Sequence, residues 1–136
     1  VTPYSPLAGG RLSRKPGQTT RRLEQDAYAH LKYDATQETD GQIIARVAEI
    51  AEKRGVSMAA VSLAWLLEKG AFPVTGMTKE SHLQGAVQAA EMQLTPEETA
   101  YLEAPYVPHA LVGVMAQNTR AAAGEKQVWT VEDKKA

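Results

Sequence analysis

The sequence predicts an α/β fold that is mostly helical, with two short strands. Two short apolar, β-leaning runs, 1–4 and 72–75, each lead into a loop that contains glycine. The stretch between them has apolar side chains at helical spacing, and the second loop leads directly into another helical pattern. The order strand, long loop, helices, strand and helix fits the last quarter of a (β/α)₈ TIM barrel. We therefore expect a C-terminal barrel fragment.

The first strand is expected at 1–4 and is followed by a turn-rich loop at 5–12. The glycines of this loop allow a ligand to approach the backbone closely. Residues 13–20 are polar and indicate an exposed loop, and a short helix is expected over about 22–31. Five Lys and Arg residues lie between Arg11 and Arg22. Such a run usually marks a solvated surface, but it could also hold phosphates.

Two firmer helices are expected from Asp40 to Arg54 and from Met58 to Lys69. Gly55 supplies the stop of the first helix, and Ser57 is expected to cap the second. The second helix is apolar almost all round, so we expect it to be buried. The first helix has one apolar stripe, formed by Ile43, Ile44, Val47, Ile50 and Ala51.

A last helix begins at a strong start signal, in which Thr95 is the N-cap, Pro96 takes the first helical position and Glu98 completes a capping box. This helix is expected to end near Ala104. We expect residues 1–113 to form one domain and residues 114–136 to form a flexible tail.

The second strand, 72–75, is short and apolar enough to be buried, and Gly76 permits a turn directly after it. A strand that turns into a helix N-terminus makes an anion site, because free backbone N–H groups and the helix dipole meet there. Thr78 is expected to cap this helix, with Lys79 in its first turn. A lysine there fits a phosphate neighbour, although a solvated surface lysine is the alternative. The expected apolar side of the helix is Leu83, Ala86, Val87 and Ala90.

The composition excludes several classes of function. The 136 residues are 43% hydrophobic and 23% charged, and the net charge of −1 gives no electrostatic case for nucleic acid or an anionic membrane. The sequence has no cysteine, and its three histidines are too far apart for a local metal site. No apolar run approaches the length of a membrane span, and we expect a cytoplasmic protein. The start at Val1, without an initiator Met, suggests the middle of a larger protein.

The segment 47–62 resembles a helix-turn-helix, since two helices meet at a Gly-Val-Ser turn. The second helix of a DNA reader must offer polar and basic side chains to the duplex. Here that helix offers mainly apolar side chains, and Lys69 at its far end is its one base. A helical hairpin packed inside a larger fold is therefore the preferred interpretation.

Several motifs together resemble those of one enzyme family, the aldo-keto reductases. The run Pro3 to Leu12 (PYSPLAGGRL) resembles the strand-seven motif of that family, and Pro73 to Leu83 (PVTGMTKESHL) resembles its strand-eight cofactor motif. The runs 48–51, 61–67 and 94–98 are similar as well. The resemblance extends from the first residue to about residue 113. It implies a (β/α)₈ barrel that transfers a hydride between NADP(H) and a carbonyl or alcohol.

The resemblance also implies a set of cofactor-binding residues. Tyr4 is expected to stack on the nicotinamide ring. The residues expected to contact the pyrophosphate are Ser5, Leu7 and Gly9. The residues expected to line the adenosine 2′-phosphate are Gly76, Met77, Thr78 and Lys79, with His82 beside the adenine and that phosphate. Many members of the family have Glu-Asn against the adenine where this sequence has Gly85-Ala86, so we expect that contact to be made differently.

The sequence shows no catalytic constellation, and we expect no catalytic residue in it. The family's tetrad of Asp, Tyr, Lys and His comes from the first half of the barrel, and neither Tyr4 nor His109 matches a tetrad position. Hydride transfer needs an acid that protonates the carbonyl, so this stretch alone is expected to be inactive and to meet a small carbonyl substrate only with the barrel's N-terminal half. The alternative is a non-catalytic interaction module that keeps the nucleotide-binding scaffold.

Overall fold

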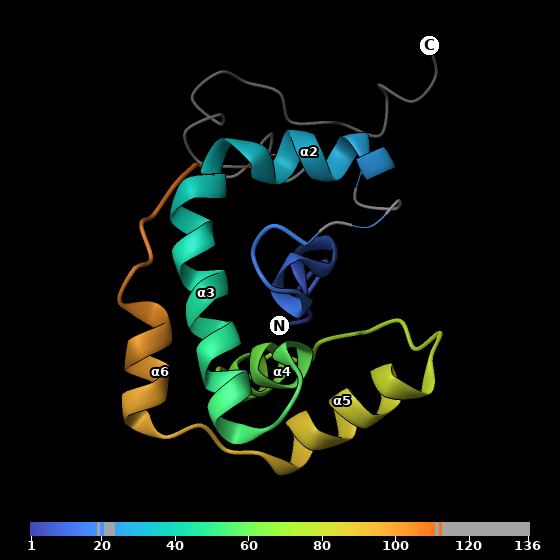
Figure 1. The fold of residues 1–136 in the computed structure, drawn as a ribbon, viewed down its shortest axis with the longest axis vertical. Helices are drawn as coiled ribbons and strands as arrows, with labels where there is room; N and C mark the ends of the chain where they lie inside the picture. The colour runs from blue at the N-terminus through green and yellow to red at the C-terminus, as the bar shows by residue number, and fades with distance from the viewer. Residues whose placement is uncertain (19, 21–23, 111, 113–136) are drawn as a thin grey trace, which may run out of the picture.

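The computed structural model describes residues 1–18, 20, 24–110 and 112. This described part is mostly helical. In Figure 1 the N-terminal segment lies in the middle, with α2, α3, α4 and α5 arranged around it and α6 outside α3. The elements are η1 (Ala8–Ser13), α2 (Ala27–Tyr33), η2 (Asp34–Thr36), α3 (Gln37–Arg54), α4 (Met58–Glu68), α5 (Glu80–Glu91) and α6 (Pro96–Glu103).

The hydrophobic core forms where α4 packs against α3 and α5 and where α6 packs against α3. Val61 on α4 is fully buried at its centre. The other buried members of this core are Val47, Ile50, Ala51, Met58, Leu63, Ala64, Ala89, Leu94 and Leu102. Burial of such side chains is the main favourable contribution to folding.

The local signals at the helix ends are confirmed. Gly55 ends α3 in the left-handed conformation, with a φ of 66°. The hydroxyl oxygen of Ser57 accepts a hydrogen bond from the backbone N–H of Ala60 at 3.1 Å and so caps α4. At α6 both bonds of the capping box are present, because Thr95 Oγ1 accepts from the N–H of Glu98 and Glu98 accepts from the N–H of Thr95.

The expectation of two short strands is wrong for the described residues, which contain no strand. The two segments do meet, since the N–H of Phe72 donates to the carbonyl oxygen of Val1 at 2.8 Å. Phe72 and Val74 are 71% and 73% exposed, so the segment 72–75 is not buried either. A strand needs a ladder of backbone hydrogen bonds with neighbours, and the described residues supply no second partner segment.

Helix α5 differs from its expected form in two ways. It begins at Glu80, and Lys79 is its N-cap, so Thr78 does not cap it and Lys79 is not in its first turn. Its buried residues are Gly85 and Ala89, whereas the expected apolar side is largely exposed. A Cβ at Gly85 would lie 3.0 Å from the Ser57 hydroxyl, so glycine permits this close contact between α5 and the start of α4.

Other boundaries and burial differ less. Helix α3 starts three residues before Asp40, and α2 is shifted towards the C-terminus from the expected 22–31, part of which lies outside the described residues. Helix α4 is buried over its first part, while Leu67 near its end is 40% exposed. The expected tail, 114–136, also lies outside the described residues. None of the described helices is both long and apolar enough to cross a bilayer.

Candidate functional site

The first expected site segment, from Tyr4 to Gly9, folds into tight successive turns. Ser5 and Ala8 have φ values of 52° and 49°, which L-residues rarely adopt, and Gly9 continues the turn with a φ of 67°. The N–H of Ala8 donates to the carbonyl oxygen of Ser5 at 2.8 Å, and the N–H of Gly9 donates to the Ser5 hydroxyl oxygen at 2.9 Å. The carbonyl oxygen of Leu7 accepts a third bond, from the N–H of Gly10 at 2.8 Å. Hydrogen bonds within residues 5–10 therefore fix the turns of this segment.

The ring of Tyr4 is presented to solvent and to α2. Tyr4 is 77% exposed, and the ammonium of Lys32 lies 4.8 Å from the centroid of its ring. Attraction between a cation and the negative face of an aromatic ring is worth about 0.5–1 kcal/mol at an exposed site. Sequence reasoning missed Lys32, although its spacing from Tyr28, four residues earlier on α2, is a recognisable helical signal.

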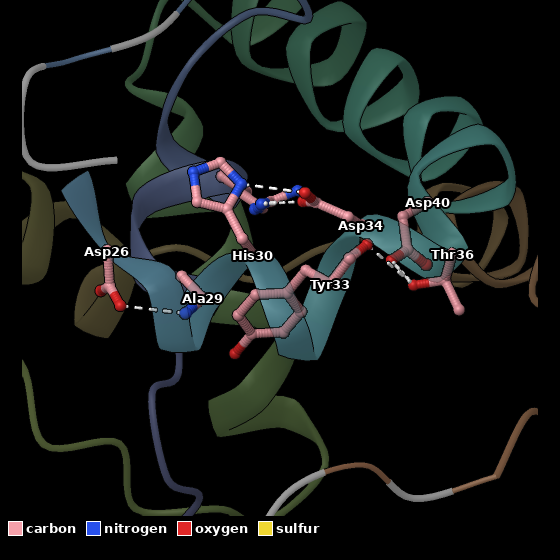
Figure 2. Close-up of polar contacts among 8 residues, drawn as sticks. Asp26, Ala29, His30, Tyr33, Asp34, Thr36 and Asp40 are labelled. Atoms are coloured by element: carbon pink, nitrogen blue, oxygen red, sulfur yellow. Dashed lines mark hydrogen bonds and ion pairs between the residues drawn. The ribbon is translucent and has the colours of Figure 1, made fainter. Parts of the chain in front are cut away.

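A polar cluster holds α2 and η2 against the first segment (Figure 2). Asp34 accepts hydrogen bonds from Arg11 Nη2 at 2.7 Å and from His30 Nδ1 at 2.9 Å. The Arg11 bond, followed by the His30 bond, lowers the pKa of the Asp34 carboxyl, and the same Asp34 bond raises the pKa of His30. Asp26 caps α2 by accepting from the N–H of Ala29 at 2.9 Å.

The second expected site segment runs from Gly76 to His82 and is exposed throughout. A Cβ added at Gly76 would meet no atom within 4 Å, so the space around this backbone is open. Met77 is 50% exposed, and Thr78 is exposed as well. Within the described residues Lys79 has no ion-pair partner, and no side chain caps the N-terminus of α5.

The structure therefore forms two separate groups from the nine expected cofactor residues. No side chain of the group 4–9 forms a hydrogen bond or ion pair with the group 76–82 in the described part of the chain. The bond from Phe72 to Val1 links the segments that precede the two groups. As for metals, no three His, Asp or Glu side chains among the described residues gather as a metal site would require.

Comparison with known proteins identifies a family. The model of the Aldo/keto reductase family matches residues 1–106. Versiconal hemiacetal acetate reductase of Aspergillus parasiticus is 41% identical over 114 residues, which is 82% of this chain and 33% of that protein. The aldo-keto reductase dtxS3 of Metarhizium robertsii is also 41% identical over 114 residues, 83% of this chain and 31% of that protein. The chain thus spans about a third of the length of the curated relatives it matches.

Proposed function

The chain belongs to the aldo/keto reductase family of oxidoreductases, which generally use a nicotinamide cofactor, and from this premise we propose that it is the NADP(H)-binding portion of such an enzyme. The observation that carries the proposal is the open start of α5, where uncapped backbone N–H groups lie beside the exposed Lys79. Exposed N–H groups and a cation suit a phosphate group.

The residues present fit such a nucleotide at both ends. At the phosphate end, Gly76 leaves open space, and Lys79 forms no ion pair among the described residues, although the acid Glu80 follows it in the first turn of α5. At the nicotinamide end, the exposed ring of Tyr4 offers a surface on which a planar ring can stack. The residues that would hold the pyrophosphate are Ser5, Leu7 and Gly9. Those that would hold the adenosine 2′-phosphate are Gly76, Met77, Thr78, Lys79 and His82.

The bound cofactor would supply the hydride for reduction of a carbonyl. No described residue takes the role of the acid that protonates the carbonyl oxygen, so we propose that turnover requires residues outside this sequence. The substrate of the whole enzyme is then a small carbonyl compound. One relative is named as a reductase of versiconal hemiacetal acetate.

We further propose that the described helices are the C-terminal part of a (β/α)₈ barrel. Two apolar surfaces that a barrel would cover support this. Leu83 and Val87 on α5 are 50% and 48% exposed, and Phe72 and Val74 are more exposed still. Apolar side chains gathered in this way usually mark an interface. The matched relatives, about three times as long as the aligned region, are large enough to contain such a barrel.

The proposal is tested by titrating the 136-residue chain with NADPH and with NADH, followed by the fluorescence of the reduced nicotinamide. We expect saturable NADPH binding. Because a hydrogen bond to a charged group contributes about 1.5–3 kcal/mol, Lys79→Ala should weaken NADPH binding by about tenfold or more and leave NADH binding nearly unchanged.

Lys53→Ala is the matched control, since Lys53 is an exposed lysine near the end of α3 and is not among the residues expected to bind the nucleotide. It should alter neither affinity. Absence of saturable binding, or an equal loss of NADPH and NADH affinity in Lys79→Ala, would contradict the proposed phosphate site.

A further inference from the structure

A cavity of about 690 Å³ lies between η1, α2 and α3 and adjoins the proposed cofactor site at Tyr4. Cavities of about 300–1,000 Å³ are the usual size of small-molecule sites. Its lining comes from three stretches of the chain, 4–12, 28–44 and 109–112, so the fold rather than local structure creates it. The lining residues used below are Tyr4, Arg11, Tyr28, Lys32, Tyr33 and Asp40.

The walls of the cavity suit a planar apolar ligand. Three of its lining residues are the tyrosines at positions 4, 28 and 33, and Leu12, Ile43 and Ile44 add aliphatic surface. Aromatic rings offer large flat contact areas, and they pair favourably with other rings in offset or edge-to-face arrangements. An aromatic ligand is therefore the best match to these walls.

Two cations line the same cavity. The Lys32 ammonium lies 4.8 Å from the ring centroid of Tyr4 and 5.3 Å from that of Tyr33. The Arg11 guanidinium lies 5.3 Å from the centroid of Tyr33. Because these side chains already place positive charge beside the two rings, a cationic ligand would be repelled there.

Both cations have capacity left for an anion. Among the described residues no acidic side chain forms an ion pair with Lys32. Arg11 is paired with Asp34 through Nη2, but its Nε atom is buried and has no acceptor in the described part of the chain. Because this Nε atom is closed to solvent, Arg11 acts on a ligand in the cavity through its positive charge and not through an Nε hydrogen bond.

The acid in the cavity lining, Asp40, is hydrogen-bonded to Thr36, which also lines the cavity. Asp40 accepts a hydrogen bond of 2.6 Å from the hydroxyl of Thr36, at the junction of η2 and α3 (Figure 2). An anionic group would be favoured beside the Lys32 ammonium and disfavoured beside the Asp40 carboxyl.

We propose that this cavity binds an aromatic ligand that carries a carboxylate, with the Lys32 ammonium as its charge partner and the Arg11 guanidinium as a second positive charge nearby. Tyr4 is shared with the proposed nicotinamide site. If that site is correct, the ligand is a substrate of the whole enzyme; this last step rests on the proposed function, whereas binding of the carboxylate does not.

The test is isothermal titration calorimetry of the 136-residue chain with three probes that share one ring system: 2-naphthoate, 2-naphthylmethanol and 2-naphthylmethylamine. We expect the carboxylate to bind at least tenfold more tightly than the neutral alcohol, and the amine to bind most weakly. Lys32→Gln should bring the affinity for the carboxylate to within about twofold of that for the alcohol, since it removes the charge partner. Lys32→Arg should keep most of the preference.

Lys53→Gln, which removes a lysine outside the cavity, is the matched control and should leave all three affinities unchanged. Equal affinity for carboxylate and alcohol, no binding of either, or equal losses in Lys32→Gln and Lys53→Gln would overturn the proposal. An NADPH titration of the same samples separates the two proposals. Naphthoate binding without NADPH binding supports the cavity and contradicts the cofactor site, and the reverse result contradicts the cavity alone.

Discussion

Replacing Glu98 by glutamine tests how the end of α3 is tied to α6. The carboxylate of Glu98 accepts from Arg54 Nε at 2.8 Å and forms a second bond with Arg54 Nη2. It also accepts from the N–H of Thr95 at 2.9 Å as part of the capping box. Glutamine can keep the capping bond through its amide oxygen, but its NH2 group then faces Arg54 Nε and cannot accept from it, so the substitution removes the charge and one hydrogen bond of the pair.

The size of the effect follows from the pKa of Glu98. The Arg54 hydrogen bonds are the main cause that lowers this pKa from 4.5 to about 2. Each unit corresponds to about 1.4 kcal/mol, which sets a ceiling of roughly 3.4 kcal/mol on the stabilisation. The side chains of Arg54 and Glu98 are 26% and 14% exposed, so solvent screens part of it. We expect Glu98→Gln to lower the free energy of unfolding by about 1–3 kcal/mol at pH 7.

The sign of the pH dependence is definite. Because the pKa of Glu98 is lower in the folded chain, its stabilisation is complete above the unfolded value near 4.5 and is lost as pH falls towards about 2. Urea unfolding followed by far-UV circular dichroism at pH 7, 4 and 3 should therefore show the gap between wild type and Glu98→Gln shrinking with pH. Glu91→Gln, at the exposed end of α5, is the control, since Glu91 forms no ion pair among the described residues. If the two free energies of unfolding are equal at pH 7, or if their difference is unchanged at pH 3, the ionised Glu98 does not stabilise the fold through Arg54.

Three further outcomes are expected. Leu63→Ala, at a core residue that is 4% exposed, should cost about 2–5 kcal/mol in urea unfolding, and a loss under 1 kcal/mol would contradict the described core. Gly85→Ala should destabilise the wild-type chain, because its Cβ would crowd the Ser57 hydroxyl at 3.0 Å, but it should stabilise a Ser57→Ala variant, in which the helix propensity of alanine contributes about 1 kcal/mol. Additive free energies of unfolding in this double-mutant cycle would contradict the close contact. Asp34→Asn should lower the raised pKa of His30 towards its ordinary value in an NMR titration; an unchanged His30 pKa would contradict the pair.

Three helix ends were predictable from the sequence because their causes are local, whereas the expected cap of α5 at Thr78 is wrong. A glycine at position 55, a serine at 57 and the Thr95 to Glu98 box each act within a few residues, and the structure confirms all three. The strands at 1–4 and 72–75 were not predictable in the same way, because a strand forms only when neighbouring segments complete its hydrogen bonds.

The buried face of α5 shows a second limit of periodicity. The spacing of Leu83 and Val87 correctly indicates an amphipathic helix, but α4 packs against the side with Gly85 and Ala89. Small residues let two helices approach closely, and the larger apolar side chains are left exposed. Periodicity identifies an apolar face but does not identify what covers it.

The candidate site was also predictable only in part. The motifs around Tyr4 and Gly76 mark two segments; in the structure 76–82 is exposed, whereas in 4–9 Tyr4 and Gly9 are exposed and 5–8 are half-buried. The position of the Lys32 ammonium over Tyr4, and the pairing of Arg11 with Asp34, depend on the packing of α2 against η1. Contacts between residues more than twenty positions apart have no signature in one sequence.

The central claim is that one nucleotide bridges the two segments, and backbone amide NMR of the chain during titration with NADPH tests it most directly. We expect saturable chemical-shift changes with one dissociation constant in both 4–9 and 76–82, and smaller changes in the second segment with NADH, which lacks the 2′-phosphate. Changes confined to one segment, or changes with no saturation in either, would contradict it.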